Sequence, residues 1–562
     1  MCGIFCAVTG SSCPDSKENL ETTYEKCKEN VQRRGPDANS SVFTAINEWN
    51  LLLASSVLWL QGTELTKQPI QTEKSWFLYN GDIFDSDILS GAERQQNGDT
   101  KPLLNAVENS LDPMCALSKM RGPFAFILID KRHQKLYFAR DTYGRRSLLI
   151  GHQNNQLVLT SVAVRHEELK LIELPALGIF CIDLTLNNLN SITLSPWRSS
   201  NQDFSRKLLE LQDFLQCPII CTGKSDILND SVVKVNDSDC VLLKTIEDQA
   251  TSEAFAMLLT NDSWLERVQR LDALLCDAIG RRIANQPAYC NECVKQMQHC
   301  EHSLVGVLFS GGLDCAILAL LADKYIATNR GIDLMNIAFE KNGSYETPDR
   351  LTARQTLIEL QTLRPDRRWN LLEINVSREE LNMARCERIS GLIYPLESIL
   401  DESLGCALWF AARGRTEHYV SPCRVLLVGM GADELFGGYT RHRAAYKRGG
   451  WTELRRELET DWRNISHRNL ARDDRVIADH GRQLRTPYLD ESVVEYIRHL
   501  HAWQKCYPSE TVIQGFGDKL LLRSLAYHLG LTQAALLKKR ALQFGSRIAN
   551  SKENAHEKSP RL

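Results

Sequence analysis

The segment at residues 305–315, with the sequence VGVLFSGGLDC, constrains the fold of this chain more than any other. An apolar run that suits a buried strand passes through a turn of small residues into an apolar helical segment at 316–325. Glycines let a backbone approach an anion closely, and a helix N-terminus presents free N–H groups to it. The segment therefore predicts a strand, a phosphate-binding loop and a helix. It lacks the Gly-Lys-Ser/Thr ending of a Walker loop, and a tight turn without a ligand is the alternative interpretation.

The chain around this loop has the pattern of a parallel α/β sheet. Apolar strands are predicted at 304–309, 334–339, 371–375 and 424–428, with helical segments between them. The run at 425–439, VLLVGMGADELFGGY, again ends a strand in small residues followed by carboxylates. Ligands of such sheets bind at the carboxyl ends of the strands, so Asp314 and Asp433 are expected to share a Mg²⁺ site there. A charge pair at a helix N-terminus is the alternative interpretation of Asp433 and Glu434.

The first two hundred residues or so are typical of short strands with turns, and one early helix is predicted at about 16–31. Residues 199–260 are more polar and indicate a linker or an insertion. Ser263 and Glu266 fit a capping box, which predicts the start of the helix that opens a second domain. The last dozen residues are polar, and we expect them to be disordered. The predicted divisions are 2–198, 199–260, 261–550 and a tail at 551–562.

Charge and apolar patterning exclude several classes of function. The formal net charge is -3, and the chain lacks the basic face of a nucleic-acid-binding protein. No apolar run approaches the roughly 18 residues of a membrane helix, and the N-terminal residues do not resemble a secretory signal. The expected compartment is therefore the cytoplasm, with no membrane partner. In that compartment most of the eighteen cysteines should be free thiols.

Five residues of types that bind metals lie close together in the sequence, at Cys290, Cys293, His299, Cys300 and His302. Cys-x-x-Cys pairs bind zinc in many proteins. The second pair follows too soon for a usual zinc finger, so the pattern favours a surface insertion with free thiols. The sequence therefore predicts no zinc here.

Cys2 directly follows Met1, and its small neighbours favour removal of that methionine. Cys2 would then carry both a thiol nucleophile and a free α-amino group, whose pKa near ~8 suits a base at neutral pH. An ordinary cysteine near a chain end is the alternative interpretation.

Several motifs occur in the order and spacing found in asparagine synthetases. In the second half these are the SGGLD loop, GADELFGGY at 431–439, RTPYLD at 485–490 and GDKLLLR at 517–523. In the first half RRGPD at 33–37, YNGDIF at 79–84, Gly98-Asp99, RGPFAF at 121–126 and RDTYG at 140–144 resemble a class II glutaminase. The chain thus resembles the glutamine-dependent asparagine synthetase family. This resemblance implies an N-terminal-nucleophile αββα sandwich, followed by an α/β parallel-sheet pyrophosphatase-loop domain.

The resemblance also implies a reaction, in which glutamine supplies ammonia and ATP with Mg²⁺ activates aspartate or another small carboxylate. The products would be asparagine, AMP, pyrophosphate and glutamate. In the glutaminase, Cys2 would be the nucleophile, Asn80 and Gly81 the oxyanion hole, and Asp99 the ligand of the glutamine α-ammonium. In the synthetase, Lys519 would neutralise charge in the transition state. The implied ATP-binding residues are Leu308, Ser310, Gly311, Gly312, Asp314, Cys315, Phe339 and Gly429, with Asp314 and Asp433 on the metal.

Three positions depart from the family pattern. Val57 aligns with an arginine that binds the glutamine carboxylate, and an apolar side chain cannot replace that bidentate contact. Met430 takes the place of a glutamate implicated in handling the incoming amine. Residues 397–404 are acidic where the family has an arginine. These departures favour an alternative, a catalytically reduced nucleotide-binding scaffold. An ATP pyrophosphatase acting on another acceptor is a third possibility.

Overall fold

The computed structural model describes most of the chain, and Met1 and parts of the predicted linker lie outside the described residues. The described residues are 2–11, 15–84, 96–153, 156–163, 165–166, 168–186, 191–197, 204–222, 241–244, 246–247, 251–512, 516–549 and 553–562.

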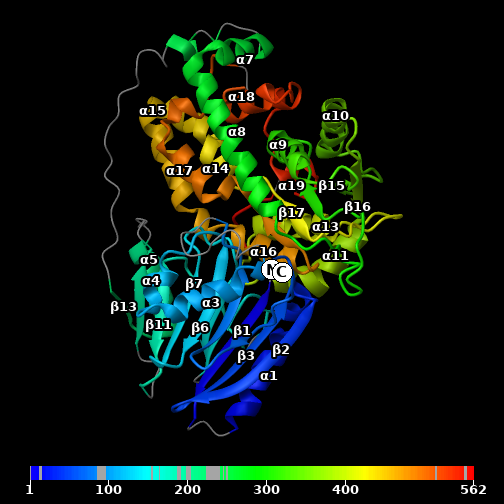
Figure 1. The fold of residues 1–562 in the computed structure, drawn as a ribbon. Helices are drawn as coiled ribbons and strands as arrows, with labels where there is room; N and C mark the ends of the chain where they lie inside the picture. The colour runs from blue at the N-terminus through cyan, green and yellow to red at the C-terminus, as the bar shows by residue number, and fades with distance from the viewer. Residues whose placement is uncertain are drawn as a thin grey trace.

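Two antiparallel sheets form the first domain (Figure 1). The six-stranded sheet has the order β10-β8-β9-β1-β3-β2, and the seven-stranded sheet has the order β13-β12-β11-β7-β6-β5-β4, in which only β12 and β13 are parallel. The strands are β1 Gly3–Gly10, β2 Ala38–Ile46, β3 Trp49–Val57, β4 Ile70–Gln71, β5 Ser75–Gly81, β6 Phe124–Asp130, β7 Lys135–Arg140, β8 Leu149–Gln153, β9 Gln156–Thr160, β10 Ile172–Glu173, β11 Gly178–Asp183, β12 Ile192–Pro196 and β13 Ile219–Cys221.

The two sheets pack face to face, with helices on their outer faces. Alternate residues of β1 and β3, such as Ile4 and Leu53, share one core with Leu78 of β5 and Ile127 of β6. Helix α1 (Ser16–Arg34) contacts the first sheet, and α3 (Thr100–Asn109) and α4 (Pro113–Leu117) pack on the outer face of the second. The predicted four-layer αββα sandwich is confirmed, and so is the early helix.

The predicted boundary at residue 198 leaves out two elements that complete this domain. Helix α5 (Phe204–Leu215) buries Leu211 and Leu215 in the core between the sheets, and β13 adds a parallel strand to β12. Polar residues cover the outer side of α5, which is why its sequence resembles a linker. Residues 199–203, 223–240, 245 and 248–250 of the predicted linker lie outside the described part of the chain.

The second domain is built on a parallel sheet with the order β16-β15-β14-β17-β18, as the alternating pattern predicts. Its strands are β14 Val305–Leu308, β15 Ile332–Phe339, β16 Trp369–Val376, β17 Val425–Leu427 and β18 Gln483–Arg485. Its helices are α7 Thr251–Thr260, α8 Asp262–Ile283, α9 Leu313–Ala322, α10 Pro348–Leu363, α11 Arg378–Ala384, α12 Ser390–Ile393, α13 Ile399–Arg413, α14 Ala432–Phe436, α15 Thr440–Arg463, α16 Leu470–Ala478, α17 Glu491–His499, α18 Leu520–His528 and α19 Leu542–Gly545. Within the described residues, no helix is both long and apolar enough to cross a membrane.

The capping residue of α8 differs from the predicted one. Asn261 has an extended backbone, and its side-chain oxygen accepts a hydrogen bond of 2.9 Å from the Trp264 backbone N–H. Ser263 therefore lies inside the first turn of the helix. Asparagine and serine cap equally well, so spacing alone did not distinguish them.

The segment at 553–562 is docked on the second domain, and the prediction that it is disordered is wrong. The Arg561 guanidinium pairs with Glu402 at 2.8 Å and with Glu553 at 2.9 Å. The backbone N–H of Ile399 donates to the Glu557 carbonyl at 2.9 Å. Polar residues hold this segment through ion pairs, which its composition does not reveal.

Candidate active sites

The first candidate site lies where β1 begins and β5 ends, in the glutaminase-like domain. The backbone nitrogen of Cys2 donates a hydrogen bond of 3.0 Å to Asn80 Oδ1. The side-chain amide of Gln68 lies 3.7 Å from the Cys2 sulfur and accepts from the Tyr79 backbone N–H at 2.7 Å. Gln68 was not predicted from the sequence, because it lies on a connection without a motif. The structure thus brings the predicted Cys2 and Asn80 into contact and adds Gln68.

Asn80 is held in one orientation by this contact. Its side chain is fully buried, and within the described part of the chain its Nδ2 has no hydrogen-bonding partner. An unsatisfied buried donor costs about 1–3 kcal/mol, so such groups need an explanation. Its position next to the Cys2 backbone suits a donor to a substrate oxygen. Gly81 follows directly, at the last position of β5.

Asp99 lies near this site at the start of α3, nearly buried. Its carboxylate accepts a hydrogen bond of 2.6 Å from the Ile83 backbone N–H. Val57 ends β3, and its side chain belongs to the apolar core between the sheets, which also includes Cys2. It offers no charge to a carboxylate. Burial raises the pKa of the Cys2 thiol, so this thiol needs a base to react.

The second candidate site is the loop between β14 and α9. Gly311 has φ +78°, and a side chain there would place its Cβ 2.4 Å from the Ala353 backbone nitrogen. Glycine is therefore required both for the conformation and for the packing against α10. The Gly312 N–H donates to Ser310 Oγ at 3.3 Å, and Gly312 caps α9. The sequence correctly predicted this strand, loop and helix.

Two acids and a lysine, which we call the acid–lysine cluster, meet at the carboxyl ends of β14 and β17. Lys519 Nζ lies 2.7 Å from Asp314 and 2.8 Å from Asp433. The lysine is buried, and a side chain at Gly438 would place its Cβ 1.9 Å from Asp433 Oδ1 and 2.3 Å from Lys519 Cε. The sequence predicted all three residues of this cluster as site residues, and the structure brings them together.

Charge and burial shift the pKa values of the three residues of this cluster in different directions. Burial and the neighbouring Asp433 raise the pKa of Asp314 despite Lys519. Burial also acts to raise the pKa of Asp433, but Lys519 and Lys539 outweigh it and lower that pKa. Burial alone would lower the pKa of Lys519, and the two carboxylates raise it. The lysine therefore stays charged, and it offsets one negative charge of the two carboxyl groups.

The acid–lysine cluster lies in the wall of a cavity of about 1060 Å³. Most of the predicted site residues line it. Gly311 lies behind the wall against Ala353, and Phe339 is buried against Phe410 with ring centroids 6.0 Å apart. These two residues therefore do not line the cavity. The predicted residues in the wall are Leu308, Ser310, Gly312, Asp314, Cys315, Gly429, Asp433 and Lys519.

Two of the departures from the family pattern also lie in this wall. Met430 lines the cavity and offers a thioether where the family has a carboxylate. Asp401, from the acidic stretch, pairs at 2.6 Å with Arg472, which also lines the cavity. Positive charge thus reaches this part of the wall from α16 instead of the acidic stretch.

Sequence reasoning missed several charged residues of the cavity. Lys538, Lys539 and Arg540 line it after α18, and Lys539 Nζ lies 3.6 Å from Asp433. The consecutive basic residues at 538–540 were the available signal. Asp349, at the start of α10, also lines the cavity, and burial raises its pKa to about 7. No sequence motif marked it.

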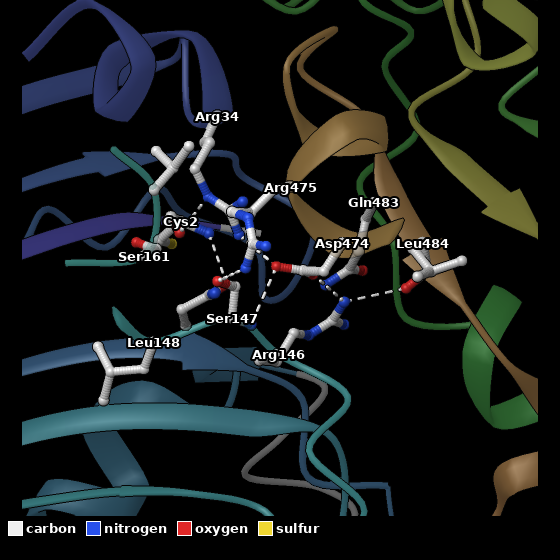
Figure 2. Close-up of polar contacts among 12 residues, drawn as sticks. Cys2, Arg34, Arg146, Ser147, Leu148, Ser161, Asp474, Arg475, Gln483 and Leu484 are labelled. Atoms are coloured by element: carbon white, nitrogen blue, oxygen red, sulfur yellow. Dashed lines mark hydrogen bonds and ion pairs between the residues drawn. The ribbon is translucent and has the colours of Figure 1, made fainter. Parts of the chain in front are cut away.

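A buried polar network joins the two domains beside Cys2 (Figure 2). Arg34 Nε donates to the Cys2 carbonyl at 3.4 Å, and its terminal nitrogen pairs with Asp474 at 2.6 Å. Arg146 pairs with Asp474 at 3.1 Å. It also pairs with Asp82 at 2.8 Å. The residue after Gly81 is thereby connected to α16 of the second domain. We call Arg34, Asp82, Arg146 and Asp474 the interdomain network.

β18 adds two further contacts to Asp82. Gln483 Nε2 donates to it at 2.7 Å, and Arg485 lies 3.2 Å away. Because β18 pairs with β17, the same strand borders the segment that carries Met430 and Asp433. The two candidate sites are therefore connected through β18.

Comparison with known proteins agrees with both halves of the chain. The family described as "Glutamine amidotransferase domain" matches residues 1–175, and the family described as "Asparagine synthase" matches 292–450 and 446–557. The asparagine synthetase domain-containing protein CG17486 of Drosophila melanogaster is 40% identical over all of both chains. The chain belongs to the asparagine synthetase family of glutamine amidotransferases. The predicted resemblance is confirmed.

Other members of this family show a range of similarity. The human asparagine synthetase domain-containing protein 1 is 34% identical, with 100% of this chain and 98% of that protein aligned. The chicken glutamine-hydrolysing asparagine synthetase is 25% identical, with 99% and 86% aligned. Family membership indicates a ligase-type enzyme that uses ATP.

Proposed function

We propose that this chain is an ATP-dependent, glutamine-hydrolysing amidotransferase that converts a small carboxylate, with aspartate as the first candidate, into its amide. The observation that carries the proposal is the acid–lysine cluster in the wall of a large cavity, next to the 310–312 loop. This combination suits phosphoryl chemistry better than a structural role, because a buried lysine between two carboxylates gains little stability over apolar packing.

In the synthetase half, Ser310 and the N–H groups at the start of α9 are proposed to bind the phosphates. Asp314 and Asp433 would hold Mg²⁺, since oxygen ligands from carboxylates suit that ion. The ion would neutralise charge on the phosphates. Lys519 would turn from the carboxylates toward the departing pyrophosphate and stabilise its developing charge. The substrate carboxylate oxygen would attack the α-phosphorus of ATP and release pyrophosphate, which gives an acyl-adenylate. Ammonia would then attack the acyl carbon, and AMP and a proton would leave as the amide forms.

In the glutaminase half, the Cys2 sulfur would attack the amide carbon of glutamine, and its proton would pass to the α-amine that follows removal of Met1. The Asn80 Nδ2 would donate to the oxyanion of the intermediate. Ammonia would leave, and water would hydrolyse the thioester to glutamate. Asp99 would bind the substrate ammonium.

Val57 and Met430 favour a second candidate function, a scaffold that binds nucleotide without amide synthesis. Val57 supplies no charge for the glutamine carboxylate, and Met430 supplies no proton acceptor for the amine. This candidate keeps the cavity and the acid–lysine cluster but predicts no turnover.

The test supplies ammonium directly, so that it does not depend on the glutaminase domain. Purified full-length protein is incubated with ATP, Mg²⁺, aspartate and ammonium chloride, while asparagine and pyrophosphate are measured together. We expect both products, and we expect both to be lost in Asp314→Ala. In a parallel reaction with glutamine, Cys2→Ala should lose glutamate release but keep synthesis from ammonium.

The possible outcomes separate the candidates. Formation of pyrophosphate without asparagine would support the proposed ATP chemistry and would show that the acceptor is not aspartate. If folded wild-type protein makes neither product with any carboxylate tested, the amidotransferase proposal fails and the scaffold becomes the leading function.

A further inference from the structure

A cluster of cysteines and a histidine lies outside both candidate sites, in the segment between α8 and β14. Cys290, Cys293, Cys300 and His302 each offer one ligand atom, and the four atoms lie within 4.8 Å of one another. The sequence favoured free thiols here, because the second pair follows the first too closely for a zinc finger. His299 is not part of the cluster, since its ring packs against Tyr289 at 6.0 Å. The fold thus selects four of the five candidate residues.

The distances within this group are those of ligands around one ion. His302 Nδ1 lies 3.3 Å from Cys290 Sγ and 3.6 Å from Cys293 Sγ. A tetrahedral zinc ion with Zn–S near 2.3 Å and Zn–N near 2.1 Å holds sulfur and nitrogen about 3.6 Å apart. Pairs of sulfur ligands are then about 3.8 Å apart. A single histidine nitrogen facing two sulfurs at this spacing is the arrangement that such an ion requires.

The backbone holds the ligands in place. Turns follow the first two cysteines, because Val294 N–H donates to the Cys290 carbonyl at 3.1 Å and Gln298 N–H donates to the Cys293 carbonyl at 3.3 Å. Asn291 N–H donates at 2.9 Å to the carbonyl of Pro422, just before β17. Arg330 donates to the His302 carbonyl at 3.2 Å. The ligand segment is therefore fixed to the sheet at both ends of the cluster.

We propose that Cys290, Cys293, Cys300 and His302 bind a structural Zn²⁺ ion. Three thiolates and one imidazole form a closed, four-coordinate set that leaves no position for substrate. Sulfur ligands favour zinc over Mg²⁺ or Ca²⁺, which bind oxygen. The thiols lose their protons on binding, and the neighbouring Arg330 offsets part of the resulting negative charge.

The position of this site indicates what the zinc stabilises. Only Ser303 and Leu304 separate His302 from β14, the strand that leads into the 310–312 loop. Tyr289, next to Cys290, packs against Trp59 of the first domain with ring centroids 5.7 Å apart. The ion would therefore fix both the start of the central strand and one edge of the domain contact. It would do so without touching the chemistry of either candidate site.

The first measurement is the metal content of the full-length protein, prepared without a polyhistidine tag from zinc-supplemented culture and dialysed against metal-free buffer. Mass spectrometry of the metals should find about one zinc per chain. Cys293→Ser and His302→Ala should lose most of it. His299→Ala and Cys115→Ser are the matched controls, and they should keep the full content because neither residue belongs to the cluster.

A second measurement keeps the proposal testable if the variants fail to fold. Wild-type protein grown with Co²⁺ in place of Zn²⁺ should show the sulfur-to-cobalt charge-transfer bands and intense visible bands of a tetrahedral thiolate site. Less than about 0.2 zinc per chain in folded wild-type protein would overturn the proposal. So would equal zinc in wild type and Cys293→Ser, or a cobalt spectrum without thiolate bands.

Discussion

Asp349 is an acid that the fold holds in an unfavourable environment. It is 5% exposed, lies in the wall of the large cavity, and has Arg540 as a cationic neighbour at 3.7 Å. Burial raises the pKa of its carboxyl to about 7, above the value of an exposed aspartate. The protonated form is therefore favoured by folding. As pH rises toward 7, the folded state binds a proton that the unfolded state has already lost, so this residue lowers stability.

Asp349→Asn should remove this pH dependence, because an amide does not ionise. The gain in unfolding free energy over wild type should grow between pH 4 and 7 and then level off, reaching at most about 4 kcal/mol. Urea unfolding at a series of pH values measures it. The control is Asp366→Asn, an exposed acid just beyond the same helix, which should show no such trend. A constant difference at all pH values would contradict the shifted pKa.

The residues predicted from sequence share one property, which is that a local motif marks them. Asp314 and Asp433 follow buried strands directly, so the sheet alone brings them to one edge. Gln68 and Asp349 lie in connections and helix starts whose positions depend on long-range packing. The spacing of residues in a short segment does not predict that packing. The position of Phe339 outside the cavity wall has the same origin, since its burial against Phe410 depends on how α13 packs on β15.

At the scale of elements, the long helix α8 illustrates both the strength and the limit of sequence patterns. The capping pattern predicted that a helix begins here, and the helix places Val268, Leu271 and Leu275 in the core. The capping residue depended on the backbone conformation of Asn261, and the sequence offered two suitable residues. α5 and β13 were missed for a similar reason, because a short strand at a sheet edge and a half-exposed helix have weak periodicity.

The cap of α8 can be tested by a matched pair. Asn261→Ala should lower the free energy of unfolding by about 1 kcal/mol, because the Trp264 N–H loses its acceptor. Ser263→Ala, at the exposed position favoured by the sequence, should change it by no more than about 0.5 kcal/mol. Thermal and urea unfolding of both variants measure the difference. A larger effect at Ser263 than at Asn261 would support the sequence prediction that Ser263 is the capping residue.

At the scale of the molecule, the interdomain network joins the two domains through buried ion pairs, and we expect it to couple their unfolding. Its side chains at Asp474, Arg34 and Arg146 are almost fully buried. Burial acts to raise the pKa of Asp474, but the two arginines outweigh it and lower that pKa. The ion pairs of Asp474 with Arg34 and Arg146 therefore contribute stability at neutral pH, and this stability is lost as pH falls. The arrangement was not predictable, because Arg34 and Asp474 are 440 residues apart in the chain.

Asp474→Asn should remove the buried carboxylate that pairs with both Arg34 and Arg146, and Asp82 would remain as a partner of Arg146. We expect a loss of about 3 kcal/mol and, in calorimetry, the replacement of one unfolding transition by two. Glutamate release should fall more than synthesis from ammonium, since Arg34 also contacts the Cys2 carbonyl. Asp213→Asn, an exposed acid on α5, is the control and should behave as wild type. A single transition at the wild-type temperature would rule out this coupling.

The docked segment at 553–562 has a consequence for how the protein is made. His556 contributes to the wall of the same cavity as Ser310, although the sheet that carries the 310–312 loop is complete by Arg485. During synthesis on the ribosome, the parallel sheet can assemble while this segment is still inside the exit tunnel. A nascent chain in that state would lack His556 in the wall of the cavity. On the proposed function, enclosure of a nucleotide should be completed only after residues 553–562 have emerged, so an arrested chain truncated after residue 552 and followed by a linker that fills the tunnel should exchange a fluorescent ATP analogue faster than one that continues through residue 562.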